Sequence, residues 1–203
     1  RVSEKSRMQS RRRSRSTSSQ SCMYNTHTRT IKTERMNEFI MAIRKIVELG
    51  DETLRKVCKP QEKFNLHLAL LLKDMADTMY KAEGVGLAAP QVGVLRRVVV
   101  IDVGDGPVEL VNPVITAREG EQCGREGCLS LPGRQGVVRR PDKVTVQAMS
   151  RKGEPFEFTA EGFFARAVCH ELDHLDGKLY IDVMDRELTR EEIEGTIPED
   201  EAE

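Results

Sequence analysis

Apolar residues recur along the chain with two different periods, and each period predicts a different kind of element. Residues 65–83 carry leucine and methionine at the three- and four-residue spacing of an amphipathic helix, at Leu68, Leu71, Leu72, Met75 and Met79. Such a stripe is typical of a helix that packs against a core. His67 lies at the start of this helix with no polar partner in view, so we expect it at the surface.

The middle of the chain has the short apolar runs of β-strands. Residues 97–103 predict one buried strand, and residues 108–115 predict a second, interrupted near Pro113. The pair Asp105-Gly106 between them is a hairpin turn signal. The two runs are therefore expected to pair as neighbouring strands.

A second hairpin and a last helix complete the pattern. Residues 143–150 and 156–162 flank a turn-like segment, and residues 161–177 contain no proline and end at Gly177, as a helix C-terminus often does. Strands thus cluster between helices, an order that predicts an α+β fold with antiparallel or mixed β-sheets. We expect the sheets to pack around this helix in the C-terminal half, with the helix at 65–83 against the sheet.

Composition divides the chain into a basic leader, a domain and an acidic tail. Residues 1–40 are rich in Arg and Ser and hold ten Lys/Arg against three Asp/Glu, whereas the rest of the chain holds 22 against 30. A segment so poor in apolar residues cannot bury a core, so residues 1–40 are expected to be a disordered or non-native leader before Met41. A transit peptide and a basic arm that binds nucleic acid are the alternatives. The domain is expected at residues 41–188, and a disordered acidic tail at 189–203.

The lengths of the apolar runs and the number of cysteines narrow the class of protein. No apolar run approaches the length of a membrane span, which argues against a membrane partner. Five cysteines, an odd number without a paired framework, argue for a reducing, intracellular setting.

The helix predicted at 161–177 carries a metal-binding pattern. His170 and His174 are four residues apart, so their imidazoles lie on one helix face and can share an ion. Glu171 stands beside the first histidine, where a carboxylate can take a proton from water. Half of the chain's four histidines fall within these five residues, which a random charged helix face explains poorly. We therefore predict a catalytic metal site, which needs a third protein ligand.

Two sources of the third ligand remain open. No histidine follows His174, but four glutamates do, in an acidic tail that suits a buried ligand poorly. They are Glu187, Glu191, Glu192 and Glu194. Upstream, Cys128 lies between Gly127 and an apolar pair and would be a strong thiolate ligand, so it is favoured. Cys169 lies about 100° around the helix from His170 and is expected in the core.

Three segments resemble, in order and spacing, the three motifs of the peptide deformylase family. They are GVGLAAPQ at 84–91, EGCLS at 126–130 and HELDHLDG at 170–177. Each motif alone is modest to moderate evidence, but three in series are highly specific, and the resemblance covers Met41 to Leu188. Members of the family remove the formyl group from the N-terminal formyl-methionine of newly made polypeptides and release formate.

The resemblance implies a role for each motif residue. One divalent metal would be held by Cys128, His170 and His174. Family members typically use Fe(II), and nickel or zinc can take its place. A metal-bound water would attack the formyl carbonyl, with Glu171 as general acid/base. The Gln91 side-chain amide and the Leu129 backbone N–H would form the oxyanion hole.

A substrate-binding set follows from the same resemblance. Gly84, Val85 and Gly86 would lie against the substrate backbone, because missing side chains permit close approach. The methionine pocket would be lined by Val85, Phe163, Ala167 and the ring of His170. Arg166 would line it with its stem and keep its charge outside. Glu126 needs a partner if buried, and Arg140 is the expected one.

The expected partners are formyl-methionyl nascent peptides in a bacterial cytoplasm, or in an organelle if residues 1–40 are a transit peptide. An acidic tail would be repelled by RNA phosphates, so stable ribosome binding is not predicted, and nucleic acid would be bound only through residues 1–40. Two other hypotheses stay in view. One is a HExxH peptidase with a downstream glutamate ligand, and the other is a non-catalytic protein that binds metal or peptide.

Overall fold

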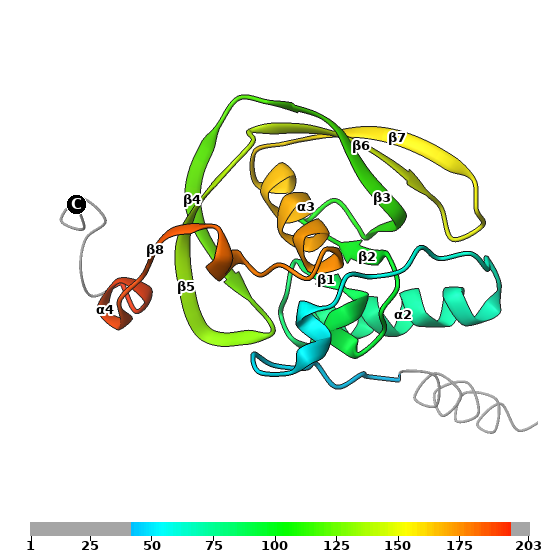
Figure 1. Cartoon of the computed structure of the whole chain (residues 1–203), viewed down its shortest axis with the longest axis horizontal. Helices are drawn as coiled ribbons and strands as arrows, with labels where there is room; N and C mark the ends of the chain where they lie inside the picture. Colours follow the sequence, from blue (N-terminus) through cyan, green and yellow to red (C-terminus); the bar gives the residue numbers. More distant parts are fainter. Residues whose placement is uncertain (1–41, 196–203) are drawn as a thin grey trace, which may run out of the picture. The chain divides into compact units, whose positions relative to one another are not determined.

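The computed structural model describes residues 42–195 of the chain (Figure 1). Its elements are η1 (Glu52–Arg55), α2 (Leu66–Lys81), β1 (Gly86–Ala88), η2 (Ala89–Val92), β2 (Val98–Ile101), β3 (Val108–Glu119), β4 (Gln122–Cys128), β5 (Leu131–Arg140), β6 (Lys143–Met149), β7 (Pro155–Glu161), α3 (Gly162–Leu175), η3 (Tyr180–Asp182), β8 (Met184–Glu187) and α4 (Arg190–Ile193). The expected leader and residues 196–203 of the expected tail lie outside the described residues. Between residues 42 and 195, no helix has the length and apolar character required to cross a membrane.

Two antiparallel sheets form the frame of these residues. The larger has five strands in the order β1-β2-β3-β6-β7, and the smaller has three in the order β4-β5-β8. Every neighbouring pair is antiparallel. The α+β prediction is confirmed, and its antiparallel alternative is the correct one. The two expected hairpins are the β2–β3 and β6–β7 connections.

β3 is longer than the sequence pattern predicts. The strand continues past Pro113 to Glu119. Its register with β6 shifts between Val111 and Val114, and Asn112 adopts a φ of 52°. Asparagine tolerates this left-handed conformation better than most residues. The proline therefore sits at a bulge, and pairing resumes beyond it.

β4 and β5 are long strands that the apolar pattern does not predict. The buried positions of β5 include Gly136 and Arg140, which are not strand-forming aliphatic residues. At Gly136 a Cβ would lie 2.8 Å from the Met184 sulfur of β8, so the close approach of the two strands excludes a side chain. Packing against α3 and β8, and not local propensity, makes this segment a sheet.

α3 lies at the centre of the described residues, with β4 and β5 on one side and the five-stranded sheet on the other (Figure 1). Val99 and Ile101 of β2 pack in the same cluster as the apolar face of α3. Their neighbours Val98 and Val100 pack with α2. Both faces of β2 are therefore buried, which explains its unbroken apolar run. The leucine and methionine stripe predicted for α2 is buried in full.

The ends of both long helices follow the sequence signals. The Asn65 side chain caps α2 by accepting hydrogen bonds from the backbone N–H groups of His67 and Leu68, and His67 is exposed. Gly177 follows α3 with a φ of 72°, and a Cβ there would lie 2.6 Å from the carbonyl oxygen of Arg55. Beyond β8, residues 190–193 of the expected tail form the short helix α4, which Thr189 caps.

Candidate metal centre

Three potential metal ligands lie close together, one at the end of β4 and two on α3. One ligand atom each from Cys128, His170 and His174 lie within 4.8 Å of one another. The His174 Nε2 and the Cys128 Sγ are 3.3 Å apart. The two imidazoles come from successive turns of α3, as the four-residue spacing predicts, and both are buried. The predicted Cys/His/His cluster is therefore present.

Cys128 reaches the histidines because β4 ends irregularly. The ladder between β4 and β5 shifts register between Gly127 and Cys128, so that Cys128 lies opposite Leu131. This irregularity turns the last residue of β4 toward α3. The half-buried thiol then lies 3.3 Å from the His174 Nε2 of the helix.

The downstream glutamates lie elsewhere. Glu187 pairs with Arg134, Glu192 pairs with Arg186, and Glu194 pairs with Arg190. Within the described part of the chain, the group of ligand atoms that can share an ion consists of the cysteine and the two histidines. The structure therefore favours the upstream cysteine over a downstream glutamate as third ligand.

Glu126 fixes the orientation of His170. Its Oε2 lies 2.9 Å from the His170 Nδ1, which leaves Nε2 of the ring to face the cluster. Arg140 donates two hydrogen bonds to the same carboxylate, at 2.9 and 3.0 Å, so the expected ion pair is confirmed. Burial opposes ionisation of Glu126, but the hydrogen bonds of His170 and Arg140 outweigh it and lower its pKa to about 2.

Glu171 is a buried carboxylate beside the cluster. Only 4% of its surface is exposed, and burial raises its pKa to about 7, although the charge of His170 acts in the opposite direction. Its Oε2 has no hydrogen-bond partner among the described residues. A carboxyl group with a pKa near neutrality can both accept and return a proton, as a general acid/base must.

The glycines of the first motif make room for the protein's own side chains. A Cβ on Gly86 would lie 2.8 Å from the Glu171 carboxyl carbon and closer still to Oε1. A Cβ on Gly84 would lie 2.6 Å from the Leu129 Cδ1. From the sequence, the missing side chains are expected to admit a substrate backbone. In the structure, the space they leave holds Glu171 and Leu129.

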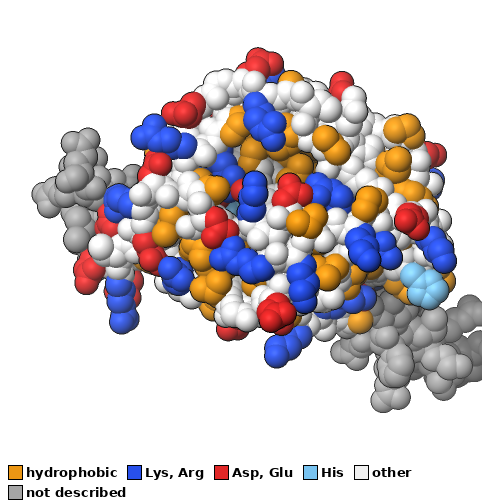
Figure 2. All heavy atoms as spheres, in the orientation of Figure 1, with side chains coloured by type: hydrophobic (Ala, Val, Ile, Leu, Met, Phe, Trp, Pro, Cys, Tyr) orange, Lys and Arg blue, Asp and Glu red, His pale blue; other side chains and the backbone are white. Residues whose placement is uncertain are grey.

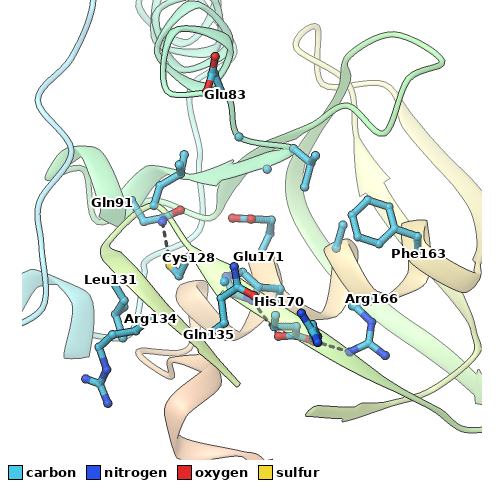
Figure 3. A pocket seen from close by; sticks show the side chains of 18 of the residues that line it. Glu83, Gln91, Cys128, Leu131, Arg134, Gln135, Phe163, Arg166, His170 and Glu171 are labelled. Atoms are coloured by element: carbon cyan, nitrogen blue, oxygen red, sulfur yellow. Dashed lines mark hydrogen bonds and ion pairs between the residues drawn. The ribbon is translucent and has the colours of Figure 1, made fainter. Parts of the chain in front are cut away.

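Gln91 is held with its amide toward the cysteine. Its Oε1 accepts a hydrogen bond of 2.8 Å from the Ala88 backbone N–H. Its Nε2 donates to the Ser130 Oγ at 3.2 Å. The same nitrogen lies 3.5 Å from the Cys128 Sγ, a contact drawn as a dashed line in Figure 3. Ser130 is a site residue that sequence reasoning missed, although it lies within EGCLS. The fixed amide can donate to negative charge that develops beside the cluster.

A pocket of about 330 Å³ opens beside this cluster. It contains the whole predicted substrate-binding set, which is Gly84, Val85, Gly86, Phe163, Arg166 and Ala167. Phe163 and Arg166 lie at one side, and Gln91 lies at the other (Figure 3). Val85 and Phe163 are 42% and 55% exposed, so both are open to a ligand. Leu129 lines the pocket as well.

Arg166 contradicts one expectation from the sequence. Its charge is expected outside the protein, but the residue is only 5% exposed. The guanidinium donates to Glu126 and to the carbonyl oxygens of Gly124 and Val138. The sequence could not show this, because these acceptors belong to the unpredicted strands β4 and β5.

Tyr180 is a further neighbour of the site that sequence reasoning missed. Its ring stacks on His170 with centroids 6.0 Å apart and an interplanar angle of 22°. The residue comes from η3, after the end of α3, and is buried. No local motif marks it, since its role depends on the chain turning back after Gly177. Cys169 is buried in the main core, as expected.

Comparison with known proteins agrees with the site. The sequence matches the model of the polypeptide deformylase family over residues 43–190. It is 56% identical to the peptide deformylase of Caldanaerobacter subterraneus subsp. tengcongensis over 155 residues, 76% of this chain and 98% of that protein. It is 58% identical to the peptide deformylase of Caldicellulosiruptor bescii over 154 residues, 76% of this chain and 93% of that protein.

Solved structures show the same relationship. A peptide deformylase from Legionella pneumophila aligns with a TM-score of 0.69 and 51% identity, covering 71% of this chain and 87% of that one. The peptide deformylase from Thermotoga maritima aligns with a TM-score of 0.70 and 41% identity, covering 71% and 99%. The chain belongs to the peptide deformylase family, enzymes that remove the N-formyl group from nascent peptides.

Proposed function

We propose that the chain deformylates formyl-methionyl peptides with one divalent metal held by Cys128, His170 and His174, and with Glu171 as general acid/base. The observation that carries this proposal is the cluster of three ligand atoms with a buried, nearly neutral carboxyl group beside it. A three-ligand shell that leaves room for a substrate is typical of catalytic metal sites, whereas structural sites use four protein ligands.

The donor set fits such an ion. A thiolate and two imidazoles suit iron, nickel and zinc alike, and Glu126 already fixes the ring of one imidazole. When bound, the ion would supply a Lewis acid that polarises a carbonyl and makes water acidic near neutral pH. We propose Fe(II) as the native ion, with nickel or zinc able to replace it. A thiolate beside iron is open to oxidation, so the protein should be handled without oxygen.

The proton steps are assigned to Glu171. A formamide is a poor electrophile, and the departing amine needs a proton. Glu171 accepts the proton of the attacking water and delivers it to the amine nitrogen, for which a pKa of about 7 is well matched. Because the group is buried, its proton is not readily lost to solvent.

Two hydrogen-bond donors are assigned to stabilise the negative charge that develops on the formyl oxygen. The Gln91 amide is held beside Cys128 by its bonds to Ala88 and Ser130, so it need not reorganise during the reaction. The Leu129 backbone N–H follows the cysteine directly. We assign the methionine side chain to the pocket between Val85, Phe163 and Ala167.

The partner follows from the reaction, namely the formylated N-terminus of a nascent peptide. We propose a cytoplasmic setting for it, since the relatives are bacterial proteins. The face of the molecule in Figure 2 intersperses basic and acidic side chains. Stable binding to ribosomal RNA is not proposed, because the acidic C-terminal end of the chain would be repelled by phosphates. Nucleic-acid binding through residues 1–40 concerns residues outside those described.

The roles can be separated by Glu171→Gln. The amide keeps the size of the side chain but cannot take a proton, so kcat for formate release should fall about 10²- to 10⁴-fold. Bound metal should stay at one ion per chain, because the three ligands are untouched. The assay uses formyl-Met-Ala-Ser and anaerobically prepared protein loaded with Fe(II). Wild-type kcat in this variant would contradict the assignment.

A further inference from the structure

The buried Arg166 guanidinium ties α3 to two strands of the smaller sheet. Its Nη1 donates to the carbonyl oxygens of Gly124 in β4 and Val138 in β5, at 3.1 and 3.0 Å, and to the Glu126 Oε1 at 3.2 Å. Its Nη2 donates to the Gln122 Oε1 at 3.3 Å. A single side chain of the metal-binding helix is thus hydrogen-bonded to both strands that carry and support Cys128.

Neutralising Glu126 does not require this second cation. Arg140 already pairs with Glu126 through two nitrogens, and its third nitrogen pairs with Asp173 at 2.6 Å. Burying a further guanidinium has a large desolvation cost, and a buried ion pair often stabilises no more than an apolar side chain of the same size. Charge balance and stability alone therefore do not account for Arg166.

The geometry of the carboxylate suggests another role. The Glu126 Oε1 accepts hydrogen bonds from Arg140 Nε and Arg166 Nη1, while Oε2 accepts from Arg140 Nη2 and lies 2.9 Å from the His170 Nδ1. The last torsion of a glutamate is only weakly restrained by itself. Two arginines approaching Oε1 from different elements hold the carboxylate plane and direct Oε2 at the imidazole.

Gly124 is fitted to this arginine. A Cβ at Gly124 would lie 3.0 Å from Arg166 Nη2 and 3.2 Å from Cζ. The backbone of Gly124 has no positive φ that would require glycine. Glycine is therefore explained at this position by the space that the Arg166 guanidinium occupies. Any side chain at position 124 would press on that guanidinium.

We propose that Arg166 is a positioning residue that acts through Glu126 to hold the His170 imidazole in its metal-binding orientation, and that Gly124 provides the space for it. The inference deepens the proposed metal site and rests on it. Because the guanidinium is almost fully covered and bonded to Glu126, its effect is measured at the metal.

The first test is Arg166→Met, which removes the cation but keeps an unbranched stem. Loss of the direct partner of a metal ligand typically weakens metal affinity about 10- to 100-fold, and because Arg166 acts through Glu126 we expect a loss near the lower end of this range. Affinity is measured with Zn²⁺ in competition with a chromogenic chelator, without any substrate. Arg166→Lys, which keeps one cation, should recover part of the affinity.

Arg139→Met is the matched control. Arg139 is the neighbour of Arg140 in β5, is exposed, and pairs with Asp185 and Glu121 away from the cluster. Arg139→Met should leave Zn²⁺ affinity unchanged.

The Arg166→Met variant is expected to fold, because Arg140 still pairs with Glu126 in it. Thermal unfolding of the metal-free proteins checks this.

The decisive test is a double-mutant cycle with Gly124→Ala, which removes no charge. Alone, it should weaken Zn²⁺ affinity by displacing the guanidinium. Added to Arg166→Met, it should have no further effect, because the group it displaces is gone. Unchanged affinity in Arg166→Met, or fully additive losses in the double variant, would overturn the proposal. Failure of the wild-type protein to release formate would instead count against the proposed function, since the affinity measurement needs no turnover.

Discussion

Gly86 lies in contact with the side chain of Glu171, the proposed general acid/base. Its backbone φ is not in the left-handed region, so alanine is allowed there by conformation, but a Cβ would overlap the Glu171 carboxylate. Gly86→Ala should therefore displace Glu171 and lower kcat for formate release about 10²-fold or more, through loss of general acid/base catalysis. Metal content should stay normal.

Gly84→Ala provides the comparison at the residue scale. Its Cβ would meet only the end of the half-buried Leu129 side chain, which can rotate away. Its loss of kcat should be the smaller of the two. Equal kcat for Gly86→Ala and the wild-type protein would show that the overlap with Glu171 has no consequence for catalysis.

Individual residues are predictable from the sequence where their chemistry is rare. Two histidines at helical spacing indicate two of the ligands, and Cys128 next to Gly127 is favoured over the downstream glutamates as the third. Arg166 lines the pocket as predicted, but the expected exposure of its charge is wrong, because a long cationic side chain on a helix is usually solvated. The acceptors on β4 and β5, which are the Glu126 carboxylate and two backbone carbonyls, are far away in the sequence and explain why this charge is buried.

At the scale of elements, the C-terminus of α3 depends on one glycine. Gly177 combines a φ of 72° with a carbonyl oxygen of the η1 segment 2.6 Å from the position of a Cβ. Gly177→Ala should lower the free energy of unfolding by about 2 kcal/mol or more, from backbone strain and the clash together. Urea denaturation of the metal-free protein measures this loss.

Gly50→Ala separates the two causes. Gly50 also has a positive φ, of 108°, but nothing lies within 4 Å of its Cβ position. Its loss of unfolding free energy should reflect the backbone strain alone and be smaller than that of Gly177→Ala. Equal losses at the two positions would mean that the close approach to Arg55 contributes nothing.

Elements with a clear apolar period are predictable, and those without one are not. The stripe of α2 and the buried run of β2 are visible because each packs aliphatic side chains on a neighbour. β4 and β5 place Gly136 and Arg140 at buried positions, so their pattern is that of a loop. Their pairing is decided by α3 and β8, which local sequence does not reveal.

For the whole molecule, the pocket and the ligand cluster are built from residues between Glu83 and His174, all within one unit that begins at Met41. A chain starting at Met41 should therefore keep the metal content and kcat/KM of the full chain. Both are measured side by side on anaerobically prepared protein. A large loss of kcat/KM on deletion of residues 1–40 would show that the leader takes part in catalysis.

The same deletion tests the basic arm. Ten Lys/Arg in residues 1–40 can release counterions from a nucleic acid, which makes binding strongly salt-dependent. If the leader is such an arm, the full chain should bind RNA or DNA at low salt and the shortened chain should not. Equal binding by both chains would assign the effect to the domain, against the mixed charges seen on the face in Figure 2.

The order of elements indicates the architecture of the whole molecule, but not how two sheets share one helix. Strands between helices predict an α+β fold, and the central place of α3 is expected from its chemistry. The division of the strands into sheets of five and three depends on pairings such as β3 with β6, which join distant segments of the chain.

The most direct test of the account measures metal content and formate release on one anaerobically purified sample each of the wild-type protein, Cys128→Ala and Cys169→Ala. The wild-type protein and Cys169→Ala should each hold one divalent ion per chain and release formate from formyl-Met-Ala-Ser. Cys128→Ala should lose both, since it removes the only thiolate of the cluster. Full metal retention and activity in Cys128→Ala, or no formate release by metal-loaded wild-type protein, would contradict the account.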